Sequence, residues 1–305
     1  MSGQRSRNWA FGTLPDQHGR TVAVTGASGG LGFEAARALA RAGATVVLVC
    51  RDAGRAEAAR VRVGDVATGP PPIVVLLDLG DLASVRAAVA AVSERCATID
   101  VLLNNAGIMA VPYARTVDGF ESQFAVNHLG HFVWTVGLAS RLTDRVVNVT
   151  TDMVRLWGFD LGDPHFERRR HGRWIAYIQS KAANVLFTRA LVRRLPAGLR
   201  AVSAHPGSTS TDLQQRTGSA IEGWGMSVFG RVVQRPPDEG VRPLLRACTD
   251  PDARSGDHFG VGGLLAFGRR EPVLEDLPAR LRDDAEADRL WATSVALTGA
   301  DLPGG

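Results

Sequence analysis

Lysine is almost absent from this chain of 305 residues: Lys181 is the only one, beside 34 arginines. A guanidinium serves as well as an ammonium on a solvated surface but is planar and forked, so such a chain keeps a lysine only where a compact cation is needed. Tyrosine is nearly as scarce, and Tyr177, one of two, stands four residues before Lys181. Residues at this spacing share a face of a helix. An incidental surface pair has the same spacing, so the rest of the chain must decide.

Cysteine and long apolar runs are also scarce. Cys50, Cys96 and Cys248 are an odd number at long spacings, which indicates neither a disulfide framework nor a zinc site and suits a reducing compartment. No run approaches the roughly 20 apolar residues that a membrane span requires. The N-terminal stretch, residues 1–20, lacks the apolar segment of a signal peptide. We therefore expect a cytoplasmic protein without a membrane span.

Positive charge is not concentrated in one region. The net charge is +4 and the pI about 9.5, but the basic residues are interleaved with 31 acidic ones. The densest basic cluster, ERRRHGRW at 167–174, is expected to be a solvated loop, so no nucleic-acid partner is predicted. A chain of this length with 45% hydrophobic residues can form one sizeable core. We predict a single domain over 1–305, with an N-terminal extension at 1–19.

Short runs that are apolar at every position alternate with longer segments whose apolar residues recur at three and four. The first pattern is typical of strands buried on both faces, and the second of helices. The expected strands are 21–25, 45–50, 73–78, 100–105, 145–150 and 200–205, and the expected helices are 31–43, 82–96, 120–142 and 176–195. Such alternation predicts an α/β protein with a Rossmann-like, doubly wound parallel sheet flanked by helices on both faces. A ligand then binds at the carboxyl ends of the strands.

The segment TGASGGLG, 25–32, directly follows the first expected strand and opens a helix. Its glycines Gly26, Gly30 and Gly32 permit a tight turn and let the backbone approach a pyrophosphate, which a helix N-terminus attracts. A glycine-rich turn without a ligand has the same composition. The position between a strand and a helix favours dinucleotide binding.

The end of the second expected strand bears on the choice of cofactor. An acid there holds the ribose 2′-hydroxyl of NAD(H), whereas a guanidinium suits the 2′-phosphate of NADP(H). Cys50 stands where the acid is expected and Arg51 follows, which favours NADP(H); in the alternative, Arg51 faces solvent and Asp52 holds the ribose. Asp78, at the end of the third expected strand, either accepts from an adenine amino group or caps the helix that begins near Leu82.

Further motifs occur in a characteristic order along nearly the whole chain: LPDQHGRTVAVTGASGGLG (14–32), NNAG (104–107), FAVNHLGHF (124–132), RVVNVTT (145–151), YIQSKAANVLFTRAL (177–191), HPGSTSTDL (205–213) and, more loosely, RLWATSVALTG (289–299). With these motifs the chain resembles the short-chain dehydrogenase/reductase family. Within it, the chain is most similar to the branch that contains retinol dehydrogenases and protochlorophyllide reductases.

The resemblance implies a nicotinamide dinucleotide site and a catalytic tetrad. The cofactor residues it implies are Gly26, Ser28, Gly30 and Leu31 at the phosphates, Asp78 and Leu79 near the adenine, Asn104, Asn105, Ala106 and Gly107 beside the adenosine ribose, and Pro206, Gly207 and Thr211 at the nicotinamide, where Thr211 could instead cap its loop. The tetrad positions are Asn127, Thr151, Tyr177 and Lys181. The family has serine where this chain has Thr151, whose hydroxyl is kept while its methyl group narrows the pocket or turns the donor aside. Gly29 is a milder departure, since the branch usually has serine there.

The resemblance also explains the single lysine. In this family a tyrosine phenol gives its proton to the developing alkoxide or, as phenolate, removes it. A cation about 4 Å away is worth about 4 kcal/mol at an effective dielectric of 20, so Lys181 is expected to bring the pKa of Tyr177 from about 10 towards 7. By resemblance, Tyr177 and Lys181 also hold the nicotinamide ribose, and Lys181 passes protons through a water on the Asn127 backbone.

Two other segments attract functional interpretations. His128 and His131 lie three apart without neighbouring acids or thiols, so packing is expected and no metal site is predicted. The segment at about 208–240 is predicted to be a variable substrate lid, because Trp224, Met226 and Phe229 make it apolar between glycines. The same residues could belong to the core.

We therefore predict an NADP(H)-dependent oxidoreductase that interconverts a lipophilic primary or secondary alcohol and its aldehyde or ketone. One alternative is a reductase of an activated C=C bond, and another is a dinucleotide-binding redox sensor without turnover. A homodimer or homotetramer, paired through the helices that carry Asn127 and Tyr177, is possible by resemblance.

Overall fold

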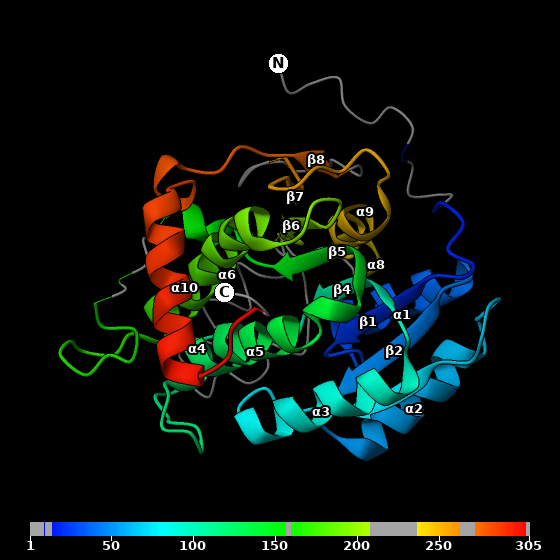
Figure 1. Cartoon of the computed structure of the whole chain (residues 1–305), viewed down its shortest axis with the longest axis horizontal. Helices are drawn as coiled ribbons and strands as arrows, with labels where there is room; N and C mark the ends of the chain where they lie inside the picture. Colours follow the sequence, from blue (N-terminus) through cyan, green and yellow to red (C-terminus); the bar gives the residue numbers. More distant parts are fainter. Residues whose placement is uncertain are drawn as a thin grey trace, which may run out of the picture.

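The structure, a computed structural model, describes residues 9, 14–156, 160, 162–207, 237–262 and 272–302. Its centre is one sheet with the strand order β3-β2-β1-β4-β5-β6-β7-β8 (Figure 1). The strands are β1 Thr21–Thr25, β2 Thr45–Cys50, β3 Ile73–Leu76, β4 Ile99–Asn104, β5 Leu142–Val149, β6 Arg200–Ala204, β7 His258–Gly260 and β8 Val273–Leu274. Neighbours from β3 to β7 pair in parallel, and β8 pairs antiparallel to β7. The predicted doubly wound sheet is confirmed, and its order reverses between β1 and β4, which opens a crevice there.

The six predicted strands are confirmed with small shifts of their ends. The third is shorter than expected, because the chain turns away at Asp78, whose backbone N–H donates to Ser84 Oγ (3.0 Å) and whose carboxylate accepts from the Gly80 N–H (2.9 Å). The sequence pattern did not indicate β7 and β8. They contain three and two residues, too few to show a periodicity.

Helices cover both faces of the sheet. They are α1 Gly30–Arg41, α2 Ala53–Gly64, α3 Leu82–Arg95, α4 Ser122–Phe124, α5 Gly130–Gly137, α6 Arg173–Arg194, α8 Pro237–Gly240, α9 Arg242–Thr249 and α10 Asp284–Thr298. The helix predicted at 120–142 is interrupted, since a π-helical turn, η1 (Ala125–Leu129), separates α4 from α5. Helix α2 was missed because it is largely exposed and buries only Ala56, Ala59 and Val63, which leaves a weak apolar pattern.

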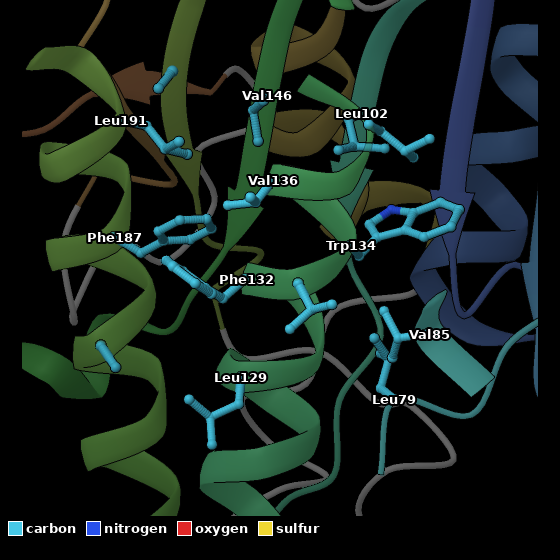
Figure 2. Close-up of a cluster of buried hydrophobic side chains, with 14 of the residues drawn as sticks. Leu79, Val85, Leu102, Leu129, Phe132, Trp134, Val136, Val146, Phe187 and Leu191 are labelled. Atoms are coloured by element: carbon cyan, nitrogen blue, oxygen red, sulfur yellow. The ribbon is translucent and has the colours of Figure 1, made fainter. Parts of the chain in front are cut away.

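Two apolar clusters lie on opposite faces of the sheet. One is built from α1, α2 and α9 against the strands, and the other from α3, α5, α6 and α10. In the second cluster the rings of Phe132 on α5 and Phe187 on α6 lie side by side with their centroids 5.5 Å apart, and Val146 of β5 belongs to the same cluster (Figure 2). This packing fixes α5 and α6 on the sheet at the level of its strand ends.

Helix α10 covers the outer side of this second cluster and lies beside α6 (Figure 1). The ring of Trp291 packs edge-on against Phe132 at 4.9 Å between centroids and lies 6.0 Å from Phe187. His128 Nε2 lies 2.8 Å from Ser294 Oγ on α10. The predicted pairing of subunits through these helices stays a prediction, and a partner would have to use surface that α10 leaves open.

A row of buried polar side chains crosses the sheet from β4 to β7. Asn104, Asn148, Ser203 and His258 are register partners on β4 to β7. Asn104 Nδ2 donates to Asn148 Oδ1 (2.8 Å), and Ser203 Oγ lies 2.8 Å from His258 Nδ1. The expectation that Asn104 lies beside the adenosine ribose is therefore wrong for its side chain, which points into the core.

No helix in the described part of the chain is both long and apolar enough to cross a membrane. The cytoplasmic location stays a prediction. The same holds for the single domain over 1–305 and for its N-terminal extension, of which Trp9 and 14–19 are described.

Candidate active site

Three elements bring the predicted tetrad together at the carboxyl edge of the sheet. Tyr177 and Lys181 lie one turn apart on α6, and both are buried. Thr151 follows the end of β5, and Asn127 lies in the π-helical turn η1. π-Helical turns are rare and occur often at functional sites.

Gly107 is the meeting point of two tetrad residues. A Cβ at this position would lie 2.9 Å from Asn127 Oδ1 and 3.3 Å from Lys181 Nζ. The side chains of Asn127 and Lys181 thus lie against the backbone of the NNAG segment, which the sequence motifs had placed at the cofactor. Any residue with a side chain at 107 would push them apart.

Asn127 is held rigidly by its own amide. Its Oδ1 accepts from the Ile108 N–H (2.8 Å), and its Nδ2 donates to Ile108 O (2.9 Å) and to Ser180 Oγ (2.8 Å). Ser180 in turn donates to the carbonyl oxygen of Tyr177 (2.7 Å). The side-chain amide of Asn127 therefore connects the segment after β4 to α6. The backbone carbonyl of Asn127 is left to accept from other donors.

Lys181 carries a buried cation without an acidic partner among the residues that the structure describes. Its Nζ donates to Val149 O at 3.1 Å. Burial lowers the pKa of Lys181 to about 8, because water no longer solvates the charged form. Near neutral pH the ammonium is charged, but it is close to losing its proton.

Tyr177 behaves differently from the expectation. Burial raises the pKa of the phenol to about 12, and the hydrogen bond with the Thr151 side chain opposes this rise only in part. The prediction that Lys181 brings this pKa towards 7 is therefore wrong for the protein alone. The error came from weighing the charge of one neighbour without the cost of desolvating the phenolate, which is the larger effect here.

Thr151 faces the phenol as the resemblance implied. Its Oγ1 interacts with Tyr177 and also accepts from the Met153 N–H at 3.4 Å, which caps the 3₁₀ turn 152–155. The ring of Trp174, one turn before Tyr177 on α6, packs edge-on against the phenol ring at 6.3 Å. A hydroxyl pair beside an aromatic wall can hold the oxygen of an apolar alcohol or carbonyl compound.

The glycine turn packs closely against its own backbone and against Asn105. Gly26 has φ +70°, and a Cβ at Gly32 would lie 2.5 Å from Gly26 O and overlap the side chain of Asn105. Gly29 is the N-cap of α1 with extended backbone and no side-chain cap, and the first turn of α1 carries no acid. The free N–H groups at this helix start therefore suit an anion, and the residues present fit a pyrophosphate.

The end of β2 lies beside the glycine turn. The buried thiol of Cys50, whose pKa burial raises to about 11, hydrogen-bonds the Ser28 side chain. Arg51 follows with an exposed side chain. The carboxylate of Asp52 accepts from the Arg55 N–H (2.7 Å) as the N-cap of α2, so the alternative in which Asp52 holds a ribose is disfavoured. The charge of Arg55 also lowers the pKa of Cys50 slightly, and Arg55 was not among the residues predicted for the cofactor site.

The other residues predicted to contact the adenosine do not all point towards a cofactor. Asp81, with its carboxylate on the Ala83 N–H (2.9 Å), caps α3, so the alternative that Asp78 does so is wrong. The Leu79 side chain is buried in the core, and its carbonyl would lie 2.5 Å from a Cβ at Gly130. Asn105 Nδ2 donates to Thr25 O (2.9 Å), so its side chain braces the glycine turn rather than reaching outward.

His205, Pro206 and Gly207 follow β6, and the last two are the residues predicted to contact the nicotinamide. His205 Nδ1 accepts from the Gly207 N–H (3.2 Å), and its Nε2 lies 3.2 Å from Glu275 Oε2. Although burial opposes it, the bonds from His205 and Arg155 hold the pKa of Glu275 well below its usual range. Glu275 and Arg155 carried no signal in the sequence, since they lie far apart in the chain, Arg155 in the 3₁₀ turn 152–155 and Glu275 directly after β8.

Thr211 and the predicted lid residues Trp224, Met226 and Phe229 lie outside the described residues.

His128 bonds to Ser294 and His131 to Thr25, so the two rings do not face a common point. Ligand atoms of His205, His258 and Glu275 lie within 4.8 Å of one another. The Arg155 guanidinium, 2.6 Å from Glu275, already supplies the positive charge in that group.

Comparisons with known proteins agree with this geometry. A family model described as short chain dehydrogenase matches residues 20–154. Retinol dehydrogenase 13 from Homo sapiens is 34% identical over 302 residues, which cover 95% of this chain and 87% of that protein. A crystal structure of an uncharacterized protein from Mycobacterium paratuberculosis has a TM-score of 0.80 at 40% identity and covers 97% of this chain and 99% of its own. A short chain dehydrogenase from Burkholderia cenocepacia in complex with NADP has a TM-score of 0.63 at 26% identity, and the match covers 80% of this chain and 96% of that one.

Proposed function

Since this chain belongs to the short-chain dehydrogenase/reductase family, in its retinol dehydrogenase-like branch, we propose that it interconverts a lipophilic alcohol and its aldehyde or ketone with NADP(H). The family makes the protein an oxidoreductase that acts on CH–OH and C=O groups. In our proposal Tyr177 is the general acid in reduction and, as phenolate, the general base in oxidation. A lipophilic substrate is supported by the likeness to retinol dehydrogenase 13 and by the Trp174 ring beside the phenol.

The observation that carries the proposal is the contact between the hydroxyls of Thr151 and Tyr177 at the strand edge where Lys181 meets Gly107. Two hydroxyls that bond each other can also bond one substrate oxygen between them. Because the phenol has a pKa of about 12, it holds its proton at neutral pH and is in the right state to donate. Thr151 Oγ1 would hold the same oxygen while Tyr177 Oη gives up its proton.

The residues that would hold the cofactor are those of the glycine turn, with the N-terminus of α1 at the pyrophosphate and Arg51 at the 2′-phosphate. Tyr177 and Lys181 would hold the nicotinamide ribose. The chemistry that the nicotinamide supplies when bound is hydride transfer. Lys181, charged below about pH 8, would offset the negative charge that Tyr177 acquires when its proton leaves.

Replacing Arg51 with aspartate is expected to shift the cofactor preference towards NADH. One charge-assisted contact to a phosphate is worth about 1.5–3 kcal/mol, so the ratio of kcat/KM for NADPH over NADH should fall by about 10- to 100-fold. Steady-state kinetics with both cofactors measures this. Arg60→Asp makes the same charge change on α2, where Arg60 pairs with Glu57, and serves as the control. An unchanged ratio in Arg51→Asp would assign the phosphate to another group, with Arg55 the first to test.

Replacing Thr151 with valine, which has nearly the same shape, is expected to lower kcat by about 100-fold, because a hydroxyl that holds the developing oxyanion is lost. Thr151→Ser keeps the hydroxyl and should stay within about threefold of the parent protein. The pair of variants separates hydroxyl from methyl in one kinetic measurement. Equal activity of the valine and serine variants would remove Thr151 from the mechanism.

The proposed function is tested by NADPH consumption with a panel of lipophilic ketones and aldehydes, retinal among them, followed by product analysis. Formation of the alcohol supports the proposal. Saturation of a C=C bond with the carbonyl intact would instead make the protein a reductase of activated alkenes. NADPH binding without turnover of any compound in the panel would favour a redox sensor.

A further inference from the structure

His131, on the first turn of α5, is buried beneath the active site and has a partner for each ring nitrogen on a different element. Its Nδ1 lies 3.1 Å from the carbonyl oxygen of Asn127 in η1. Its Nε2 lies 2.9 Å from the hydroxyl oxygen of Thr25 at the end of β1. One imidazole thus joins the turn that carries a tetrad residue to the strand from which the glycine turn begins.

Thr25 connects His131 to the NNAG segment, 104–107. Its hydroxyl oxygen accepts from the backbone N–H groups of Asn105 (2.9 Å) and Ala106 (3.0 Å). These two residues pack against Gly26, where a Cβ would lie 3.0 Å from the Ala106 Cα. The Thr25 hydroxyl therefore fixes the distance between the glycine turn and the NNAG segment, and His131 fixes the hydroxyl.

Counting hydrogens determines the form of the imidazole. A carbonyl oxygen only accepts, so Nδ1 carries the hydrogen and donates to Asn127. Nε2 is then an acceptor. The Thr25 hydroxyl already accepts two N–H groups, so its own hydrogen goes to Nε2 at 2.9 Å rather than to Leu103 O at 3.4 Å. Burial lowers the pKa of His131 to about 3, which keeps this neutral form throughout the physiological range.

His128 provides a comparison on the same stretch of helix. It is equally buried, and its Nε2 lies 2.8 Å from Ser294 Oγ, which donates to Leu290 O within α10. It therefore anchors α10 and touches neither Thr25 nor the NNAG segment in the described contacts. A histidine with a purely structural role is thus available one turn away.

We propose that His131 is a positioning residue that sets two things separately: through Nε2 the placement of the cofactor-binding NNAG segment, and through Nδ1 the placement of the Asn127 carbonyl in the catalytic turn. The proposal rests on the proposed function for its second half. Its first half concerns cofactor binding alone.

Two substitutions separate these contacts. In His131→Asn the amide nitrogen is attached to Cγ, as Nδ1 is, so it can still donate to Asn127 but cannot reach Thr25. In His131→Gln the amide oxygen lies one atom further out, as Nε2 does, so it can still accept from Thr25. His131→Leu removes both contacts at similar volume. The measurements are the Kd for NADPH by fluorescence titration, kcat for carbonyl reduction, and the thermal midpoint.

His131→Asn should weaken NADPH binding by about tenfold with kcat nearly unchanged. His131→Gln should lower kcat by about tenfold with NADPH binding nearly unchanged. The size follows because one buried hydrogen bond is worth about 1 kcal/mol or slightly more. The leucine variant should show both losses. His128→Asn, His128→Gln and His128→Leu should lower the thermal midpoint without such a division between Kd and kcat.

Equal losses in the asparagine and glutamine variants, or losses that follow the thermal midpoint as in the His128 series, would reduce His131 to a packing residue. If the parent protein turned over none of the carbonyl compounds, the proposed function would fail. The role of His131 in cofactor placement would still be tested, because it requires that His131→Gln bind NADPH more tightly than His131→Asn does.

Discussion

Replacing Tyr177 with phenylalanine is expected to lower kcat for carbonyl reduction by about 10³-fold while the Kd for NADPH changes little, because a positioned proton donor contributes about 10²- to 10⁴-fold. The phenol is the right donor, since burial holds its pKa at about 12 and keeps it protonated. Its hydroxyl interacts with Thr151 across the site where a substrate oxygen would lie. Phenylalanine keeps the ring and its edge-on contact with Trp174, so the fold should be retained.

The other tyrosine of the chain offers a matched control. Tyr113 is 44% exposed and its hydroxyl accepts from Arg115 Nε (3.1 Å), away from the tetrad. Tyr113→Phe should leave kcat within about twofold, as most surface substitutions do. If Tyr177→Phe retained more than a tenth of the parent kcat with an unchanged thermal midpoint, Tyr177 would not be the proton donor, and the proposed mechanism would be wrong.

Replacing Lys181 with methionine is expected to abolish measurable turnover, with kcat lower by at least about 10²-fold, and at the same time to stabilise the fold. Both effects have one cause. The ammonium is buried and donates to the backbone carbonyl of Val149, so its charge is costly in the folded state and useful only for chemistry. Arginine should also be inactive, because a planar fork does not fit between Gly107 and Val149, where Nζ lies 3.1 Å from Val149 O.

The pH dependence of this stability effect has a definite sign. The folded-state pKa of Lys181, about 8, lies below its ordinary value of 10.5, so the unfolded chain binds more protons between these two values. The parent protein should therefore gain stability as pH rises from about 8 to about 10, by an amount on the order of 3 kcal/mol for this group. Below about pH 8 the cost is fully present, and Lys181→Met lacks it.

Denaturant unfolding of the parent protein and Lys181→Met at pH 7 and pH 10 measures the difference. The free energy of unfolding of the variant should exceed that of the parent at pH 7, and the gap should close by pH 10. A variant less stable than the parent at pH 7 would show that the ammonium is stabilised by contacts beyond its bond to Val149. Lys181→Arg keeps the charge at both pH values. The difference in the free energy of unfolding between Lys181→Arg and Lys181→Met should therefore be the same at pH 7 and pH 10.

Continuous apolar runs such as 45–50 and 21–25 predicted the parallel sheet, because only strands buried on both faces are apolar at every position. The single lysine and the tyrosine four residues before it also predicted that these two side chains share a helix face, and α6 confirms it. Continuous apolar runs and helical periodicity are local properties of a chain. For this reason they could be read before any contact was known.

The direction of the Tyr177 shift could not be predicted in this way. It depends on how completely the phenol is shielded from water, and that shielding forms only when α6 packs on β5 and β6 and the ring of Trp174 lies against the phenol. The π-helical turn at Asn127, the Arg155–Glu275 pair beneath His205 and the link from His131 to Thr25 likewise join segments far apart in the sequence.

The order of residues along the chain determined the sheet, the glycine turn and the identity of the groups that carry the chemistry, because each of these follows from composition and spacing over a few turns. The tertiary structure alone decided their charge states and mutual bonds. Desolvation and hydrogen bonding act through space, and their strength is fixed only when distant elements close around Tyr177, Lys181 and His131.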